Sequence, residues 1–167
     1  MLGIADDLKE GSPAAVRTLS EQGIEVWVIT GDREVTAQTI ASRLGIENVM
    51  AQVLPADKAE KVRELQAMGK TVAFVGDGMN DSPALAQANV GIALGSGTDV
   101  SVEAGDIVLV GDDLRDVVVA MDLGRKTVSK IKQGFFWALI YNMILLPVAA
   151  GLLFPSLGLY LLSLIHI

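Results

Sequence analysis

Short apolar runs alternate with amphipathic stretches along the first two thirds of the chain. Several of the apolar runs are rich in β-branched residues, which is typical of buried strands. The predicted strands are Leu2–Ala5, Glu25–Thr30, Val49–Gln52, Thr71–Val75, Val90–Leu94 and Ile107–Val110. The predicted helices are Pro13–Gln22, Glu34–Leu44, Pro55–Met68, Ser82–Ala88 and a segment from Asp113 onward. This alternation indicates an α/β fold, with a parallel sheet and helices on both faces.

Residues at the helix ends support this assignment. Ser12 is the expected N-cap of the first helix, with Pro13 in its first position. Gly23, Gly45 and Gly69 each follow the end of a predicted helix. Because functional groups of parallel sheets gather just beyond the carboxyl ends of the strands, the loops after the strands are the places to search for chemistry.

The last part of the chain has a different pattern. No residue from 133 to 167 carries a formal charge when His166 is taken as neutral. Phe135–Phe154 is long enough to span about 30 Å as a helix, the hydrocarbon thickness of a bilayer. We therefore predict an integral membrane protein in contact with the lipid bilayer. A buried core helix is the alternative, but a domain this small offers little core to surround it.

Charge divides the chain near the same place. All 20 acidic residues and nine of the 13 basic residues precede Arg125, which gives residues 1–124 a net charge of −11. The remaining basic residues stand just before the apolar run, at Arg125, Lys126, Lys130 and Lys132. By the positive-inside rule, residues 1–132 are expected in the cytoplasm, and the plasma (inner) membrane is the expected location. The predicted domains are 1–124 and a membrane region, 125–167, whose final segment is too short to cross again.

Composition argues against several functions. The chain has no cysteine, so it has no disulfide framework and no thiolate metal site. Its acidic first part argues against nucleic acid as a partner. The first residues show neither a basic region nor a cleavage-site pattern, so no signal peptide is expected.

Two loops after predicted strands hold groups suited to phosphate. In Thr30-Gly31-Asp32, a hydroxyl and an unobstructed backbone N–H precede a helix, which suits a phosphate oxygen. A capped turn explains these residues equally well. Lys58 lies in the first turn of a predicted helix, where its charge opposes the helix dipole. An anion nearby would make this position favourable, although a solvated surface lysine is the alternative.

The loop after Thr71–Val75 gives the strongest signal. It places Asp77 and Asp81 around two glycines within six residues, Gly-Asp-Gly-Met-Asn-Asp. Mg²⁺ takes carboxylate oxygens, and carboxylates this close repel each other unless a cation or hydrogen bonds compensate. Asp77 is therefore the expected Mg²⁺ ligand. Asp81 is a supporting group, with N-capping of the next helix as its alternative role.

A hydroxyl, a lysine and a magnesium carboxylate, each after its own strand, are groups that phosphoryl transfer requires. A nucleophile that accepts the phosphoryl group is missing from this set. The one Asp-Lys pair, Asp57-Lys58, is followed by Ala-Glu and falls within a predicted helix.

These motifs, in this order, resemble a known family. TGD, LPADK and VGDGMNDSPALAQANVGIALGSGTDV resemble the phosphorylation domain of the P-type ATPases, over about Gly3–Pro155. The wider match, including FFWALIYN, is to the heavy-metal subclass and most closely to copper(I)-exporting pumps. The resemblance implies a haloacid dehalogenase-like, Rossmannoid fold. It also implies ATP hydrolysis through an aspartyl-phosphate, with Mg²⁺ and ATP as cofactors, coupled to export of Cu⁺ or another soft metal ion.

The resemblance implies roles for particular residues. Asp77 would bind Mg²⁺ and Lys58 would pair with the phosphoryl oxygens. The full set implied in catalysis is Thr30, Gly31, Asp32, Lys58, Asn80 and Asp81. In the predicted span, Tyr141 and Asn142 match a Tyr-Asn pair at the ion pathway of copper pumps; an ordinary aromatic and a helix–helix hydrogen bond are the alternatives.

Parts of the family pattern are absent from this sequence. It has no Asp-Lys-Thr-Gly-Thr segment, whose Asp is the family's nucleophile, and no Cys-Pro-Cys helix. The nucleotide-binding domain, the actuator domain and the upstream membrane segments are likewise absent. We therefore expect a carboxyl-side fragment that is inactive alone. The alternatives are a zinc- or cadmium-type pump fragment, a membrane-anchored haloacid dehalogenase-like phosphatase and a non-catalytic binding module.

Overall fold

The computed structural model describes residues 11–76, 80–95, 105–111 and 113–149. The chain divides into two units, Met1–Ala120 and Met121–Ile167. Each unit is considered by itself below.

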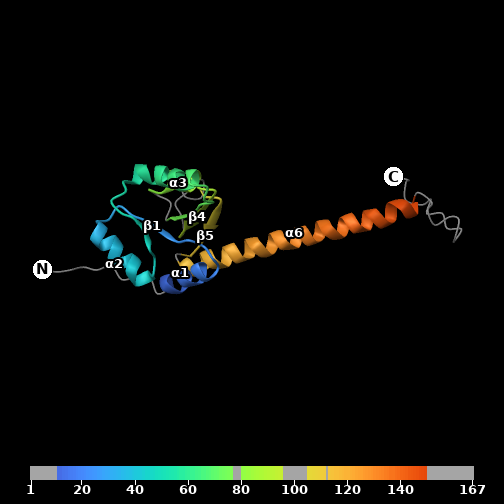
Figure 1. Cartoon of the computed structure of the whole chain (residues 1–167), viewed down its shortest axis with the longest axis horizontal. Helices are drawn as coiled ribbons and strands as arrows, with labels where there is room; N and C mark the ends of the chain where they lie inside the picture. Colours follow the sequence, from blue (N-terminus) through green and yellow to red (C-terminus); the bar gives the residue numbers. More distant parts are fainter. Residues whose placement is uncertain (1–10, 77–79, 96–104, 112, 150–167) are drawn as a thin grey trace. The chain divides into compact units, whose positions relative to one another are not determined.

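The first unit contains the α/β elements (Figure 1). Its strands are β1 (Trp27–Ile29), β2 (Asn48–Met50), β3 (Ala73–Gly76), β4 (Val90–Leu94) and β5 (Ile107–Leu109). Its complete helices are α1 (Ser12–Glu21), α2 (Glu34–Leu44), α3 (Lys58–Ala67) and α4 (Ser82–Gln87), with a 3₁₀ turn, η1 (Pro55–Asp57), before α3. The predicted bounds of α2 and β4 are confirmed, and the predicted strand Leu2–Ala5 lies outside the described residues.

Two helix starts differ from the prediction. Ser12 is the first residue of α1 rather than its N-cap; the N-cap is Gly11, and Ser12 is buried. The helix predicted from Pro55 begins as the 3₁₀ turn and becomes an α-helix only at Lys58. Both shifts are of a few residues at a terminus, where local pattern specifies helix bounds least well.

The strands pair in parallel, as predicted, but in two hydrogen-bonded ladders. In the first, β1 pairs with β2, and Val28 lies opposite Val49. In the second, β4 lies between β3 and β5, and Ile92 lies opposite both Val75 and Ile107. The carboxyl ends of the strands in each ladder therefore meet at one edge, which is where the candidate chemistry begins.

Helices cover both faces of β1, and adjacent residues of that strand show this directly. Val28 packs against a cluster formed by Val16 of α1, Ala41 of α2 and Ile46. Ile29 packs against the other cluster, which consists of Val62, Phe74, Ala84, Leu85 and Ala93. Because successive side chains of a strand point to opposite faces, the strands separate α1 and α2 from α3 and α4. Figure 1 shows α3 on the side of the strands away from α1.

Helix α4 approaches β4 very closely. A Cβ on Gly91 would stand 2.6 Å from the carbonyl oxygen of Leu85, so only glycine fits there without displacing backbone. Leu85 and Val62 are among the most deeply buried side chains of the described residues. Burial of a side chain of this size contributes about 1.5–3 kcal/mol, which makes the contact between α3, α4 and β4 a rigid support for the loops at their ends.

The described part of the second unit is helical and belongs to α6 (Leu114–Ala149), which begins in the first unit. Pro147 lies inside this helix. Leu114–Val148 is long and apolar enough to cross a membrane, by length and composition. Large apolar side chains of its second half, such as Leu139 and Met143, are 70% and 78% exposed, as expected for a surface that faces lipid or other helices.

Candidate active site

Three of the predicted site segments follow β1, β2 and β3. Thr30–Asp32 follows β1 directly, and Lys58 begins α3 after β2 and the turn η1. Asn80 and Asp81 follow β3 and lead into α4. Asp77 lies outside the described residues, one position past the end of β3.

Thr30 and Asp32 form a turn in which their polar groups hydrogen-bond to each other. The Thr30 hydroxyl donates to Asp32 Oδ2 at 3.0 Å, and the Asp32 backbone N–H donates to Thr30 Oγ1 at 3.1 Å. This is the capped turn that the sequence left open as an alternative. Gly31 and Asp32 are exposed, so the turn presents a backbone N–H and a carboxylate to solvent or to a ligand.

The loop after β2 is bonded to this turn through the backbone. Val53 N–H donates to the Thr30 carbonyl at 3.0 Å, and Gln52 N–H donates to the Asp32 carbonyl at 2.9 Å. Gln52 has a φ of 56°, a left-handed conformation that is uncommon for a residue other than glycine. These contacts hold the turn next to the segment that leads to Lys58.

Lys58 is paired with Asp81. Its Nζ lies 2.6 Å from Asp81 Oδ1, and the two side chains are only 17% and 12% exposed. Lys58 is therefore not a solvated surface lysine. The pair joins the first residue of α3 to the residue that precedes α4, and Asp81 supplies the anion that offsets a cation at the start of a helix.

Asp81 does not cap α4 with its side chain. The helix has no side-chain capping hydrogen bond; the Asp81 carbonyl accepts from the backbone N–H groups of Ala84 and Leu85 at 2.9 and 2.8 Å. The carboxylate instead reaches Lys58, where both the donor and the acceptor of the hydrogen bond are charged. Asp81 thus occupies the N-cap position of α4, as its alternative role has it, but without the side-chain hydrogen bond of a cap.

The end of β3 fits the Asp81 carboxylate closely. A Cβ on Gly76 would stand 2.7 Å from Asp81 Oδ2 and 2.9 Å from Asp81 Cβ, so glycine is required for this approach. The carboxylate therefore lies beside the end of β3. Carboxylate oxygens are the donors that Mg²⁺ prefers, and Asp81 places one such group beside the end of β3, paired with Lys58. Among the described residues, no group of three or more acidic or histidine side chains could hold a metal ion.

The remaining predicted residues are placed less closely. Asn80 is exposed. Tyr141 and Asn142 both lie in α6, and Tyr141 is 63% exposed. The structure thus brings together Thr30 with Asp32, and Lys58 with Asp81.

Known proteins show the same combination of sequence and fold. A family model described as haloacid dehalogenase-like hydrolase matches residues 1–89. The chain belongs to the haloacid dehalogenase-like hydrolase family. This agrees with the fold class predicted from the sequence, with parallel strands and covering helices.

The relatives of this haloacid dehalogenase-like chain are ion pumps. A probable copper-exporting P-type ATPase of Archaeoglobus fulgidus is 58% identical over 158 residues, which cover 95% of this chain and 20% of that protein. The probable copper-transporting ATPase PacS of Synechocystis is 52% identical over 161 residues, or 96% of this chain and 22% of that protein. The predicted resemblance to heavy-metal P-type ATPases is confirmed.

A solved structure extends the match to three dimensions. A zinc-transporting PIB-type ATPase in its E2·Pi state is 37% identical and superposes with a TM-score of 0.77, over 87% of this chain and 24% of that chain. The present chain thus spans about a fifth of the length of the curated relatives described above.

Two features of the site were not predicted from the sequence. The left-handed Gln52 has no signal in the run Ala-Gln-Val, because glutamine is not a residue that favours this conformation. The partner of Lys58 was also missed. The one available signal was the unfavourable position of a cation at a helix start, which indicated an anion but not which one.

Proposed function

We propose that this chain is the phosphate- and magnesium-binding part of an ATP-driven exporter of a heavy-metal cation, Cu(I), that works through an aspartyl-phosphate intermediate. The observation that carries the proposal is the Lys58–Asp81 ion pair at the strand ends. The relatives of the chain include a probable copper-exporting P-type ATPase and a probable copper-transporting ATPase. The membrane of residence, the plasma (inner) membrane with residues 1–132 in the cytoplasm, belongs to the same proposal.

The site has groups for holding a phosphoryl group. Lys58 has a fixed ammonium with donors to spare beyond its bond to Asp81, and these suit phosphoryl oxygens. Thr30 and Gly31 offer a hydroxyl and a backbone N–H on the neighbouring turn, and Asp32 orients that hydroxyl. Bound Mg²⁺, held by Asp77 with Asn80 and Asp81 in support, would neutralise charge on the transferred group.

The nucleophile is the part that this sequence lacks. It contains no Asp-Lys-Thr-Gly-Thr segment, so we expect the purified chain to form no phosphoenzyme from ATP. The missing carboxylate, the nucleotide-binding and actuator domains and further membrane segments would be supplied by the rest of the pump. Acid-stable ³²P incorporation by the chain alone, lost on treatment with hydroxylamine, would contradict the expectation that the chain lacks the nucleophile.

A chimera tests the proposal directly. The corresponding segment of the Archaeoglobus fulgidus relative is replaced with this chain, which is 58% identical to it. We expect Mg²⁺-dependent phosphorylation from ATP that is stimulated by Cu(I). Asp77→Asn should reduce phosphorylation to background, because it removes the proposed Mg²⁺ ligand.

The control is Glu47→Gln, which neutralises an exposed carboxylate just before the start of β2, away from the carboxyl ends of the strands. It should leave phosphorylation unchanged. A chimera that is phosphorylated normally with Asp77→Asn would refute the metal assignment. A chimera that binds ATP but never becomes phosphorylated would refute the proposed role of the whole chain.

The transported ion is tested separately. Tyr141 and Asn142 support Cu(I), whereas the zinc-transporting structural relative favours zinc as a second candidate. Tyr141→Ala or Asn142→Ala in the chimera should weaken stimulation by Cu(I) while phosphorylation from inorganic phosphate persists. Stimulation by Zn²⁺ or Cd²⁺ rather than Cu(I), lost in the same variants, would favour the zinc- or cadmium-type reading. Hydrolysis of a small phosphoester by the chain alone would favour the membrane-anchored phosphatase.

A further inference from the structure

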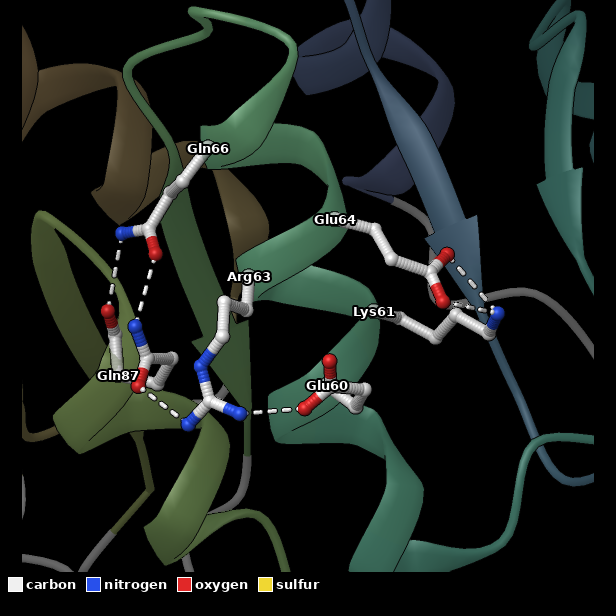
Figure 2. A network of polar contacts seen from close by, with 6 residues as sticks. All are labelled: Glu60, Lys61, Arg63, Glu64, Gln66 and Gln87. Carbon is white, nitrogen blue, oxygen red and sulfur yellow. Dashed lines mark hydrogen bonds and ion pairs between the residues drawn. The ribbon is translucent and has the colours of Figure 1, made fainter.

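The far ends of α3 and α4 are joined by a pair of side-chain amides. Gln66 Nε2 donates to the backbone carbonyl of Gln87 at 2.9 Å, and Gln87 Nε2 donates to Gln66 Oε1 at 2.8 Å. Figure 2 shows the two amides facing each other across the helices. Both residues are half-buried, so water competes for their hydrogen bonds less than it would at a fully exposed pair.

Neighbouring residues extend the amide pair on both sides. Arg63 donates to Gln87 Oε1 at 3.2 Å and also pairs with Glu60 of its own helix (Figure 2). Gln66 Nε2 also lies 3.2 Å from Asn89 Oδ1, which accepts the Val72 backbone N–H at 2.9 Å. The amide pair therefore connects α3 and α4 to the segment that enters β3.

The near ends of the same helices are joined by the Lys58–Asp81 ion pair. Lys58 begins α3 and Asp81 immediately precedes α4, whereas Gln66 and Gln87 lie at the carboxyl ends of the two helices. The helices therefore run in the same direction, with polar contacts at both ends. Along α3 those contacts are about 12 Å apart, at 1.5 Å per residue.

Between the two contacts the helices meet through apolar side chains, which include Val62 of α3 and Ala84 and Leu85 of α4. Apolar packing of this kind is non-directional, so it sets the angle between the two helices less sharply than hydrogen bonds do. A second, directional contact at the end away from the ion pair restricts that angle further. Displacement of the far ends would change the distance between Lys58 and Asp81.

We propose that Gln66 and Gln87 are positioning residues, whose paired amides fix α3 against α4 so that Lys58 stays paired with Asp81. The inference rests on the proposed function in taking Lys58 and Asp81 as phosphoryl-transfer groups. The amides touch no reacting atom; they act through the helices. For phosphoryl transfer, a fixed ammonium needs no reorganisation when charge develops on the transferred group.

The test measures how accessible the Lys58 amine is in the folded full chain. Amine labelling by a limiting amount of acetic anhydride, resolved by mass spectrometry, gives the rate at Lys58 relative to Lys61 of the same helix. Gln66→Met keeps the length of the side chain and removes its hydrogen bonds. We expect about a fivefold rise in the relative rate, the factor that corresponds to one net hydrogen bond. Gln87→Met, which breaks the pair from the other helix, should give the same rise.

The matched control is Gln38→Met, a change of the same chemistry on an exposed position of α2; it should leave the ratio unchanged. A second measurement decides whether the amides act through the ion pair. Asp81→Asn should itself raise Lys58 labelling, and adding Gln66→Met should then raise it no further, because the two changes act on the same contact.

A Lys58 rate that stays within twofold of the original in both Gln66→Met and Gln87→Met would overturn the proposal. So would a rise that adds in full to that of Asp81→Asn. These readouts need no catalytic activity. If the chimera described above is inactive while Lys58 labelling changes as expected, the proposed function is refuted, but the positioning of the ion pair by Gln66 and Gln87 is still supported.

Discussion

The turn at Thr30–Asp32 and the Lys58–Asp81 ion pair stand at the same kind of place, beyond the end of a strand, but they are built differently. The turn joins residues two apart and is largely exposed. The pair joins residues 23 apart, and its side chains are 17% and 12% exposed. A local turn keeps its geometry when its surroundings shift, whereas the ion pair exists only if α3 and α4 are packed correctly. Changes at the pair should therefore cost much more stability than changes at the turn.

The largest effect is expected for Lys58→Met, which leaves the Asp81 carboxylate without its partner in a site that is 12% exposed. We expect a loss of about 3 kcal/mol in the free energy of unfolding. Urea denaturation in detergent, followed by Trp27 fluorescence in a Trp137→Phe background, measures it. Lys61→Met is the control, since Lys61 forms an i,i+3 pair with Glu64 and is 34% exposed; it should cost under about 0.5 kcal/mol. Equal losses in the two variants would show that the Lys58–Asp81 pair contributes no more to stability than the surface pair of Lys61 and Glu64.

The next largest effect is expected for Gly76→Ala. The new Cβ would stand 2.9 Å from Asp81 Cβ and 3.1 Å from Phe74 Cε1, so the carboxylate must move away from Lys58. Overpacking of this kind costs about 2 kcal/mol, and Lys58 labelling should rise with it. In contrast, Gly31→Ala in the turn would meet the Val53 carbonyl at 3.4 Å, an ordinary contact, and should change stability little. A neutral Gly76→Ala, measured by the same denaturation, would show that the close approach is not required.

A smaller effect is expected for Thr30→Val, which keeps the shape of the side chain and removes the hydroxyl. Both hydrogen bonds of that hydroxyl are made to Asp32 and are exposed, so the loss should be about 0.5–1 kcal/mol. In the chimera, the same change should lower phosphorylation more than stability. A loss as large as that of Lys58→Met would mean that the turn supports the core rather than the chemistry.

The smallest effect concerns Glu25, remote from the site. Its hydrogen bond to Lys70 lowers the pKa of the Glu25 carboxyl below its usual value of 4.5. A lowered folded-state pKa stabilises the fold above about pH 4.5, and this contribution is lost as the pH falls through the folded-state pKa. Glu25→Gln should therefore be slightly less stable than the original at pH 7, and this difference should shrink as the pH falls below about 4.5. Because the Glu25 side chain is 48% exposed, 1 M salt should remove most of the difference. A stability difference between Glu25→Gln and the original that grows as the pH is lowered would contradict the lowered pKa of Glu25.

Local pattern was sufficient for most of the fold. Helix α2 and strand β4 begin and end where the sequence predicts, because apolar periodicity and a following Gly45 specify them without help from distant residues. The pairing of strands into two ladders was not predictable in this way. Register and neighbours depend on long-range contacts that an apolar run does not encode.

The site shows the same division. The sequence alone determined which side chains follow the strands: Thr30, Asp32, Lys58 and Asp81 are polar residues placed after apolar runs, and parallel strands bring such residues to one edge. Only the tertiary structure decided that Lys58 pairs with Asp81 and that the Asp81 side chain makes no capping hydrogen bond to α4. The physical reason is that a carboxylate takes the strongest donor within reach, and which donor is within reach depends on how α3 packs against α4.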